Sequence, residues 1–343
     1  MNNIKICIIG LGYVGLPLAI TLSKKYKVIG YDINKDRIKN LINGKDETFQ
    51  VEKKTVSKSK INFTNNINHI KESNFYIITV PTPVLKNNSP DLRALIKSSK
   101  VVGQNLNFKD VVVYESTTYP GCTNELCIPL LEKFSKLKVN DDFYCGYSPE
   151  RVNPGDKKHG IDKIKKIISA SSAKGLKYIR SVYENVSPKN IIEVKSIKIA
   201  EGAKIIENTQ RDINIALMNE LSILFNKLNI DFTKVLKAAN TKWNFINFKP
   251  GLVGGHCIGV DPYYLAFKAE KVKFNPKMIL SGRSVNDYMH KYIVKMLYDK
   301  FKKSFMNHKK NILIVGLTFK ENVPDCRNSQ SIKIAKIISK KSN

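Results

Sequence analysis

The first 32 residues constrain the fold more than any other part of the sequence. A short β-branched run, Ile4–Ile9, is followed directly by Gly10-Leu11-Gly12-Tyr13-Val14-Gly15 and by a helical pattern that ends near Ser23. Strand, glycine turn and helix in this order begin a βαβ unit. Gly10 allows the tight turn, Gly12 lets a diphosphate approach the backbone, and Gly15 permits close packing of helix on strand. The sequence therefore predicts an N-terminal, Rossmann-like, doubly wound α/β sheet.

The second predicted strand, Lys27–Asp32, indicates the ligand of this unit. It ends in a carboxylate about 20 residues into the unit, where an acid hydrogen-bonds the ribose hydroxyls of a dinucleotide. A carboxylate there favours NAD over NADP. We predict NAD as the cofactor, bound by Gly10, Gly12, Tyr13, Val14, Gly15 and Asp32. Arg37 either lies against the adenine or the ribose edge, or is an ordinary solvated helix residue.

Length and cysteine usage favour an intracellular enzyme. A chain of 343 residues holds about two to three domains. Its six cysteines lack metal-ligand spacing, so we expect reduced thiols and no metal site. No uncharged apolar run reaches the about 18 residues of a membrane helix, and no signal peptide precedes the first strand. We therefore expect a cytoplasmic protein with no membrane partner.

The charge favours another class of partner. Lys and Arg total 58 against 29 acidic residues, a net charge of +29, which is typical of proteins that bind nucleic acid or an anionic surface. The lysines, however, are spread along the chain, in loops such as 51–60 and 163–166, without one stripe that alternates with aromatic residues. We interpret them as a compositional bias of solvated positions and expect no nucleic-acid partner; a nucleic-acid or surface-binding protein remains the least favoured alternative.

Polar loops follow the next three predicted strands. Phe75–Val80 ends at Thr82, Asp110–Glu115 ends at Thr117, and Phe143–Tyr147 leads into Glu150. Open α/β sheets bind ligands outside the carboxyl ends of their strands, so these loops belong near the cofactor. The two threonines offer hydroxyls to the ligand or satisfy their own loops. Glu150 is a candidate acid, base or water holder, or a surface carboxylate.

A helical pattern begins near residue 200. Ala200–Asn229 predicts one helix of about 45 Å, and Asp231–Ala239 predicts another. Lys204, Asn208 and Arg211 fall at i, i+4 and i+7 and share a face of the long helix. This polar stripe is either the solvated side of the helix or a Lys and an amide that converge on a substrate oxygen.

Cys257 lies in a glycine-rich turn, four residues before Asp261. A thiolate can attack an aldehyde to form a hemithioacetal, which loses a hydride to become a thioester that water cleaves. A cysteine beside a hydride acceptor therefore suggests oxidation beyond an aldehyde. The alternative is a small buried residue, since free cysteines are among the most buried residue types.

Several motifs together resemble the UDP-glucose/GDP-mannose dehydrogenase family, and within it the bacterial branch that oxidises UDP-N-acetylhexosamines for surface polysaccharides such as the Vi antigen. The resemblance runs from Ile4 to about Gln330 and rests on GLGYVGLPLA (10–19), VPTP (80–83), ESTTYPG (115–121), YSPERVNPGDKKH (147–159), KIIENTQRDINIALMNE (204–220) and GGHCIGVDPYYL (254–265). It implies that two NAD oxidise the sugar C6 alcohol to a carboxylate.

The same resemblance implies roles for single residues. Cys257 would be the nucleophile, Lys204 and Asn208 would stabilise the oxyanion, and Asp261 would assist proton transfer. Thr117 and Glu150 would position water. Further substrate contacts would come from Arg151, Arg211, Gly254, Gly255 and Lys320, and Thr82 and Arg327 would contact the cofactor. UDP-glucose dehydrogenases carry a second glutamate where residues 151–154 read Arg-Val-Asn-Pro, and a lysine where Val260 stands, which favours the N-acetylhexosamine branch.

We expect three domains: an NAD-binding Rossmann-like domain (1–185), an all-helical substrate and dimerisation domain (196–300), and the start of a truncated nucleotide-sugar-binding, Rossmann-like domain (310–343). The last would hold a strand at 310–316 and a helix at 329–340. The long helix predicts a homodimer through its apolar residues Ile205, Ile206, Ile213, Leu217, Leu221 and Leu224. The alternatives are a truncated, NAD-binding but inactive remnant, or a dehydrogenase of UDP-glucose, UDP-ManNAc or UDP-GalNAc.

Overall fold

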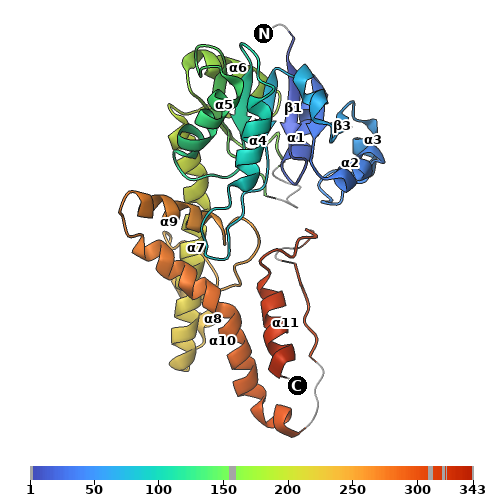
Figure 1. Cartoon of the computed structure of the whole chain (residues 1–343). Helices are drawn as coiled ribbons and strands as arrows, with labels where there is room; N and C mark the ends of the chain where they lie inside the picture. The colour runs from blue at the N-terminus through green and yellow to red at the C-terminus, as the bar shows by residue number, and fades with distance from the viewer. Residues whose placement is uncertain (1–2, 154–159, 308–311, 319–320, 322, 342–343) are drawn as a thin grey trace. The chain divides into compact units, whose positions relative to one another are not determined.

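The computed structural model describes residues 3–153, 160–307, 312–318, 321 and 323–341 (Figure 1). The chain forms two compact units, Met1–Ile205 and Ile206–Asn343. Each unit has its own architecture and is considered separately. The first holds the predicted nucleotide-binding sheet and the second is helical.

The described part of the first unit contains one sheet of eight strands in the order β3-β2-β1-β4-β5-β6-β7-β8. The strands from β3 to β6 pair in parallel, whereas β7 runs antiparallel to β6 and parallel to β8. This is the strand order of a Rossmann-like fold, so the predicted fold class is confirmed. The strands are β1 (Lys5–Ile9), β2 (Lys27–Tyr31), β3 (Asn62–Thr64), β4 (Phe75–Ile78), β5 (Val111–Tyr114), β6 (Tyr144–Tyr147), β7 (Lys166–Ala170) and β8 (Ile191–Glu193).

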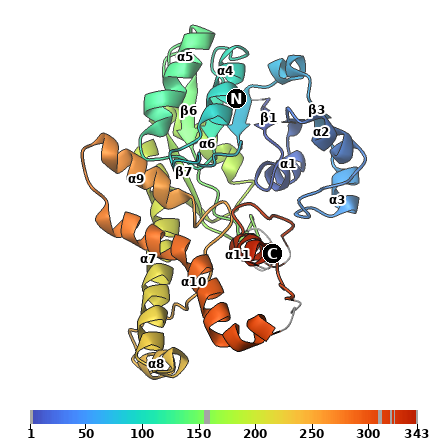
Figure 2. The ribbon, with the colours of Figure 1, turned by 60° about the horizontal axis from the view of Figure 1, so that its bottom comes forward.

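The alternation of side chains along the strands explains why helices cover both faces of the sheet (Figure 2). Ile6 and Ile8 of β1 share a buried cluster with α1 and α6, whereas Cys7 between them points to the opposite face. Tyr114 at the end of β5 hydrogen-bonds Ser99 of α4, at 2.8 Å. The helices are α1 (Gly15–Ser23), α2 (Lys35–Ile42), α3 (Lys53–Lys58), η1 (Ile67–Glu72), α4 (Arg93–Gly103), η2 (Thr123–Cys127), α5 (Ile128–Ser135) and α6 (Ala173–Tyr183).

The second unit is built from helices, as predicted. The long helix α7 spans Ile197–Lys227 and therefore begins in the first unit. The others are α8 (Phe232–Ala239), α9 (Asp261–Lys271), α10 (Lys277–Asn307) and α11 (Gln330–Lys341), with α11 packed along α10 (Figure 1). The predicted helices at 200–229, 231–239 and 329–340 are confirmed within three residues at each end.

The strand predicted at 310–316 is wrong for the residues that the structure describes. Residues 312–317 form no strand, and the side chains of Leu313 and Val315 are exposed. A strand needs a partner for its backbone hydrogen bonds, and the described part of this unit contains no other strand to supply one. The segment has a composition that favours a strand, but the described part of this unit has no sheet with which it could pair.

None of the helices in the described ranges is long and apolar enough to cross a membrane.

Candidate active site

The glycine turn after β1 has the geometry that its sequence predicts. Gly10 has φ +96° and its N–H donates to the carbonyl of Tyr31 at 2.8 Å. A Cβ on Gly15 would lie 1.9 Å from the carbonyl oxygen of Gly10, so only glycine fits there. The Asp32 carboxylate accepts from the backbone N–H groups of Leu11 and Asn34, each at 2.9 Å. The Asp32 carboxylate therefore stabilises the glycine turn through its hydrogen bond with Leu11.

These residues fit a bound dinucleotide. A Cβ on Gly12 would meet nothing within 4 Å, so the turn leaves open space in front of its exposed backbone. Helix α1 begins directly behind it, and a helix N-terminus attracts phosphate. Asp32 remains partly exposed, and each carboxylate oxygen accepts only one of these hydrogen bonds. The space, the helix end and the acid are the three parts that NAD needs.

Arg37 is buried, so the interpretation of this side chain as a solvated helix residue is wrong. Its Nε donates to the carbonyl of Leu11 at 2.9 Å, and its Nη2 lies 2.8 Å from Asp46 Oδ1. Arg37 therefore supports the glycine turn from inside the protein. A direct contact between Arg37 and NAD stays a prediction.

Glu150 belongs to a buried charge cluster that the sequence did not predict. The ammonium of Lys166 lies 2.8 Å from Glu115 Oε2 and 3.2 Å from Glu150 Oε2. The hydroxyl of Tyr183 donates to Glu115 at 2.5 Å. Lys166 is 0% exposed, so its interpretation as one of the solvated loop lysines at 163–166 is wrong. The antiparallel direction of β7 explains the cluster, because it places the first residue of β7 beside the carboxyl ends of β5 and β6.

The cluster makes Glu150 an ionised acceptor. Burial raises the pKa of Glu150, but the Lys166 ammonium, the N–H of Val152 and the charge of Lys204 lower it below its ordinary value. Burial raises the pKa of Glu115 by more than the Lys166 ammonium lowers it, so the pKa of Glu115 stays above its ordinary value. The two carboxylates together hold the pKa of Lys166 above its ordinary value against the effect of burial. Of the roles open to Glu150, the geometry therefore favours a base or water holder over an acid.

The loop after β5 is tied to α7 by Glu201, another residue that the sequence did not single out. The buried carboxylate accepts from the hydroxyl of Thr123 at 2.7 Å, from that of Thr118 at 3.2 Å and from the N–H of Gly121 at 2.5 Å. Thr117 lies partly exposed in this anchored loop, and Thr82 lies partly exposed after β4.

Lys204 follows one turn after Glu201 on α7 and is partly buried. Its charge lowers the pKa of Glu150, so the structure brings these two predicted residues together. Arg151 donates from its N–H to Glu150 at 2.8 Å and from Nη1 to the carbonyl of Lys165 at 3.0 Å. Its guanidinium is thus held beside the same cluster.

In the second unit, Cys257 occupies a turn that leads into α9. Its carbonyl accepts from the N–H of Val260 at 3.0 Å and of Asp261 at 2.9 Å. The thiol is partly exposed, whereas Cys7, Cys122, Cys127 and Cys145 are buried and Cys326 is exposed. The interpretation of Cys257 as a merely buried residue is therefore wrong. Gly254 and Gly255 lie at the start of this turn, and Gly255 has φ +80°.

Three predicted residues meet behind the cysteine turn. The side-chain amide of Asn208 donates to Asp261 Oδ2, and Nη2 of Arg211 donates to Asn208 Oδ1. Asn208 and Asp261 are buried, while Arg211 is exposed. The structure thus links one end of the predicted polar stripe on α7 to the residue that closes the Cys257 turn.

A buried arginine that the sequence did not single out lies behind the same turn. Arg283 pairs with Asp212 at 2.7 Å and with Asp287 at 2.6 Å, and its guanidinium lies 3.9 Å from the place where a Cβ of Gly259 would be. Asp287 lies four residues later on the same helix, α10, but Asp212 lies on α7, so the local pattern shows only half of the pairing. Arg327 is exposed and pairs with Asp325 at 2.5 Å, and Lys320 lies outside the described residues.

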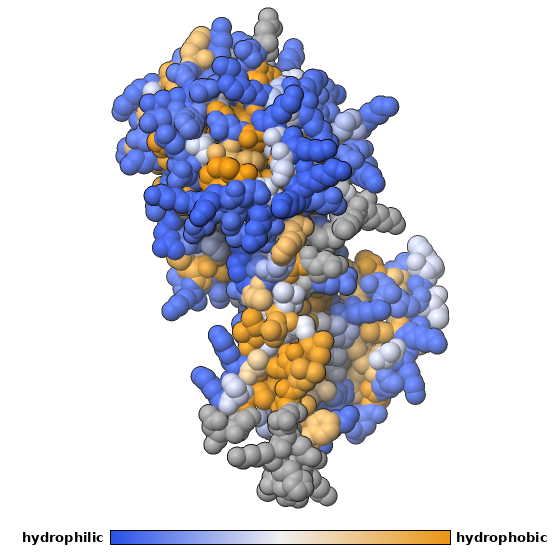
Figure 3. Space-filling view, turned by 90° about the vertical axis from the view of Figure 1, so that its right-hand side faces the viewer, coloured by the Kyte–Doolittle hydropathy of each residue, from blue (hydrophilic) through white to orange (hydrophobic). Residues whose placement is uncertain are grey.

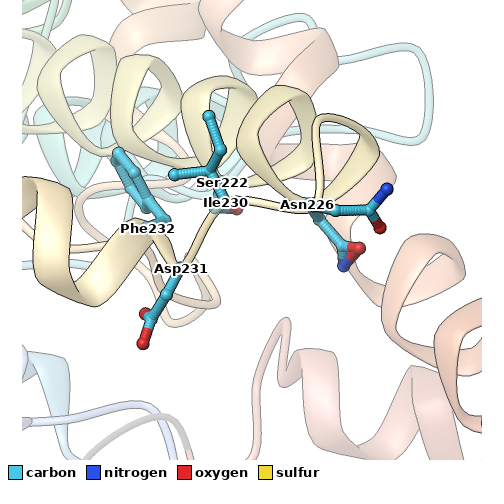
Figure 4. A pocket seen from close by; sticks show the side chains of 6 residues that line it. Ser222, Asn226, Ile230, Asp231 and Phe232 are labelled. Carbon is cyan, nitrogen blue, oxygen red and sulfur yellow. The ribbon is translucent and has the colours of Figure 1, made fainter.

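The second unit has a surface pocket of about 410 Å³ (Figure 4). Its walls come from the end of α7, the start of α8 and the turn between them, through Ser222, Asn226, Asn229, Ile230, Asp231 and Phe232. It contains none of the predicted site residues, so we assign it no part of the chemistry.

Comparison with known proteins shows which family this chain matches. Residues 4–187 match the NAD binding domain of the UDP-glucose/GDP-mannose dehydrogenase family, and residues 198–288 match the central domain of that family. The chain is 52% identical over 342 residues to the UDP-N-acetyl-D-glucosamine 6-dehydrogenase of Salmonella typhi, a match that covers 99% of this chain and 80% of that protein. The enzyme of the same name from Pseudomonas aeruginosa is 49% identical, over 98% of this chain and 80% of that protein. The solved structure of a UDP-D-ManNAc dehydrogenase from Pyrococcus horikoshii matches with a TM-score of 0.88 at 32% identity, over 98% of this chain and 81% of that chain.

Proposed function

Because the chain belongs to the UDP-glucose/GDP-mannose dehydrogenase family, we propose that it oxidises the C6 alcohol of UDP-N-acetyl-D-glucosamine to the carboxylate, with two NAD consumed for each sugar. The substrate follows from the relatives: identity is 52% to the Salmonella typhi UDP-N-acetyl-D-glucosamine enzyme and 32% to the Pyrococcus horikoshii UDP-D-ManNAc enzyme. The inactive-remnant alternative is not favoured.

The Cys257 turn is the observation that carries the proposal. Cys257 is partly exposed, and the buried Asn208–Asp261 pair holds the end of its turn. The sulfur adds to the carbonyl carbon of the intermediate aldehyde and gives a hemithioacetal. Loss of a hydride and a proton leaves a thioester. Addition of water then breaks the carbon–sulfur bond, and the thiol and the carboxylate are released.

In the first unit, Glu150 and Thr117 handle water and protons in our proposal. Glu150 stays ionised because its pKa is held below the ordinary value; this makes it a weak base, so its main task is to orient, by accepting a hydrogen bond, the alcohol or the water whose proton is transferred. Lys204 supplies a positive charge for the oxygen that becomes negative, and a preorganised donor of this kind is worth about a hundredfold or more in rate. Asn208 stabilises the same oxygen in our proposal, and Asp261 assists the proton transfer.

NAD, when bound, accepts a hydride in each of the two oxidations. Gly12 and the start of α1 would hold its diphosphate and Asp32 its ribose hydroxyls, with Tyr13, Val14, Thr82 and Arg327 as further contacts. The domain division at 1–185, 196–300 and 310–343 is part of the same proposal.

A homodimer through α7 is also part of this proposal. In the second unit, Ile206, Leu217 and Leu224 of α7 are each about half exposed or more. Hydrophobic surface also gathers over the second unit in the lower half of Figure 3, but this view faces the side on which Figure 1 draws α11, so it is separate from the face of α7. Ile205, which we expected in the face of α7, is buried and contributes nothing to it. An exposed apolar face of this kind is typical of an interface between subunits.

The test is NADH release by the purified chain with a panel of UDP-GlcNAc, UDP-GalNAc, UDP-ManNAc and UDP-glucose. We expect two NADH for each sugar consumed and the highest kcat/KM with UDP-GlcNAc. Cys257→Ser removes the nucleophile and should abolish steady-state acid formation, while NAD binding, measured by calorimetry, stays within about twofold.

Cys326→Ser is the matched control, because Cys326 is exposed and has no place in the proposed chemistry. It should keep the parent rate. Unchanged turnover in Cys257→Ser would remove the covalent mechanism. A preference for another sugar would replace the proposed substrate within the same family.

A further inference from the structure

The segment just before α11 contacts the loop that leads into Cys257. The side-chain amide of Asn328 donates to the carbonyl of Gly255 at 3.0 Å. The side-chain amide of Gln330 donates to the carbonyl of Val253 at 2.9 Å, in a buried setting. Two side chains from one short segment therefore donate hydrogen bonds to two backbone carbonyls that lie within four residues of Cys257.

A second kind of contact joins the same two segments. His256 Nδ1 lies 3.3 Å from Asp325 Oδ2, and His256 is the immediate neighbour of Cys257. Asp325 is buried, which raises its pKa, but hydrogen bonds from Arg327 and the nearby His256 bring the pKa below its ordinary value. The carboxylate is therefore ionised and fixed from both sides.

The loop that leads into Cys257 needs such support because it has no regular secondary structure to fix its backbone. Residues 245–254 form no helix or strand, and the turn contains three glycines, of which Gly255 has φ +80°. Glycine loses more backbone freedom on ordering than any other residue. A hydrogen bond that fixes a carbonyl beside a glycine removes that freedom locally. The distances above place such bonds on both sides of Gly254.

We propose that the side chains of Asp325, Asn328 and Gln330 form a clamp that sets the position of the Cys257 thiol, with Asn328 and Gln330 as positioning residues. The proposal rests on the proposed function, in which the sulfur attacks an aldehyde carbon. A nucleophile displaced by about 1 Å loses about a hundredfold in rate. A donor that holds the preceding carbonyls therefore affects turnover without touching the substrate.

The experiment compares Asn328→Asp and Asn328→Ala with the parent, all in a Cys326→Ser background so that Cys257 is the reactive thiol. Aspartate keeps the shape of asparagine but has no N–H to donate to Gly255, and alanine removes the donor without adding charge. Iodoacetamide alkylation of Cys257, followed by mass spectrometry, should be about fivefold faster in both variants, because loss of one net hydrogen bond makes local opening about that much easier. With UDP-GlcNAc, kcat should fall about tenfold while KM stays within twofold.

Asn226→Asp is the matched control, since Asn226 is an exposed asparagine on α7. It should leave the alkylation rate and kcat at the parent values. Alkylation within twofold of the parent in both Asn328 variants, an equal rise in Asn226→Asp, or an unchanged kcat in both would overturn the clamp. If the parent releases no NADH with any of the four UDP-sugars, the proposed function fails, and the alkylation rates alone still decide whether the clamp exists.

Discussion

Replacement of Lys166 by methionine tests the buried cluster most directly. Methionine fills a similar volume but leaves Glu115 and Glu150 without their positive partner. Removal of one member of a buried ion pair costs about 3–5 kcal/mol, because the remaining charge stays buried without compensation. For a unit of this size each kcal/mol lowers Tm by about 2–4 °C, so we expect a loss of roughly 6–20 °C.

The loss should depend on pH. Without the ammonium, the pKa of Glu115 rises further above that of an unfolded chain, about 4.3 for Glu, and the pKa of Glu150 loses the main interaction that holds it below that value against burial. A carboxylate with a raised folded pKa stabilises the fold at low pH and destabilises it as pH rises. The deficit of Lys166→Met relative to the parent should therefore be small near pH 5 and largest near pH 8. Adding Glu115→Gln should recover part of it, because only one buried carboxylate then remains.

The assay is urea unfolding of both proteins, followed by circular dichroism at pH 5, 6.5 and 8. Lys27→Met is the matched control, since Lys27 lies 3.1 Å from Glu72 with both side chains more than half exposed. Exposed pairs contribute about 0.2–1 kcal/mol, so this variant should change little at any pH. A Lys166→Met protein that loses no more than Lys27→Met at pH 8 would refute the reasoning.

Three further measurements test other parts of the structure. Burial raises the pKa of Asp110 to about 7, so this carboxyl stabilises the fold below about pH 4 and stabilises it less as pH rises through 7. In urea unfolding, the free energy of unfolding of Asp110→Asn should therefore increase relative to that of the parent between pH 4 and 8. A difference between the two proteins that stays constant over this range would contradict the prediction. Asp32 should repel a 2′-phosphate, so NAD should bind at least about tenfold more tightly than NADP in calorimetry; equal affinities would show that Asp32 does not face the ribose. Light scattering should give a dimer that Leu217→Glu splits into monomers, and a monomeric parent would exclude the interface on α7.

The features that sequence predicts well are those whose physical requirement is local. Gly10 and Gly15 are visible because a positive φ and a close approach of two backbones leave glycine as the residue that fits. The helix α7 is visible because its apolar spacing runs through about 30 residues. Cys257 and Asp261 stand in one short motif, and their contact with the turn is a backbone property of that motif.

The features that sequence misses depend on pairing between distant segments. Lys166 belongs to a run of lysines in a chain with 58 basic residues, and only the antiparallel pairing of β7 with β6 buries it. Arg37 lies in a helix with a polar exposed side, and only the approach of Asp46 and the glycine turn encloses its guanidinium. The strand expected at 310–316 has suitable residues, but strand formation needs a partner that composition does not report.

Two cationic side chains, Lys166 and Arg211, act on residues of the proposed chemistry. A carboxylate that must accept a proton near neutral pH has to remain ionised, although burial favours its neutral form. Lys166 meets most of that requirement for Glu150 from inside the protein, because it lowers the pKa of Glu150 more than Lys204 does, and in our proposal Lys204 serves an oxygen of the substrate. Arg211 has a comparable relation to Asn208: its donation to the amide oxygen fixes which end of the amide faces Asp261. In both cases a cation orients a neighbouring group, and the oriented group is the one to which we assign the reaction.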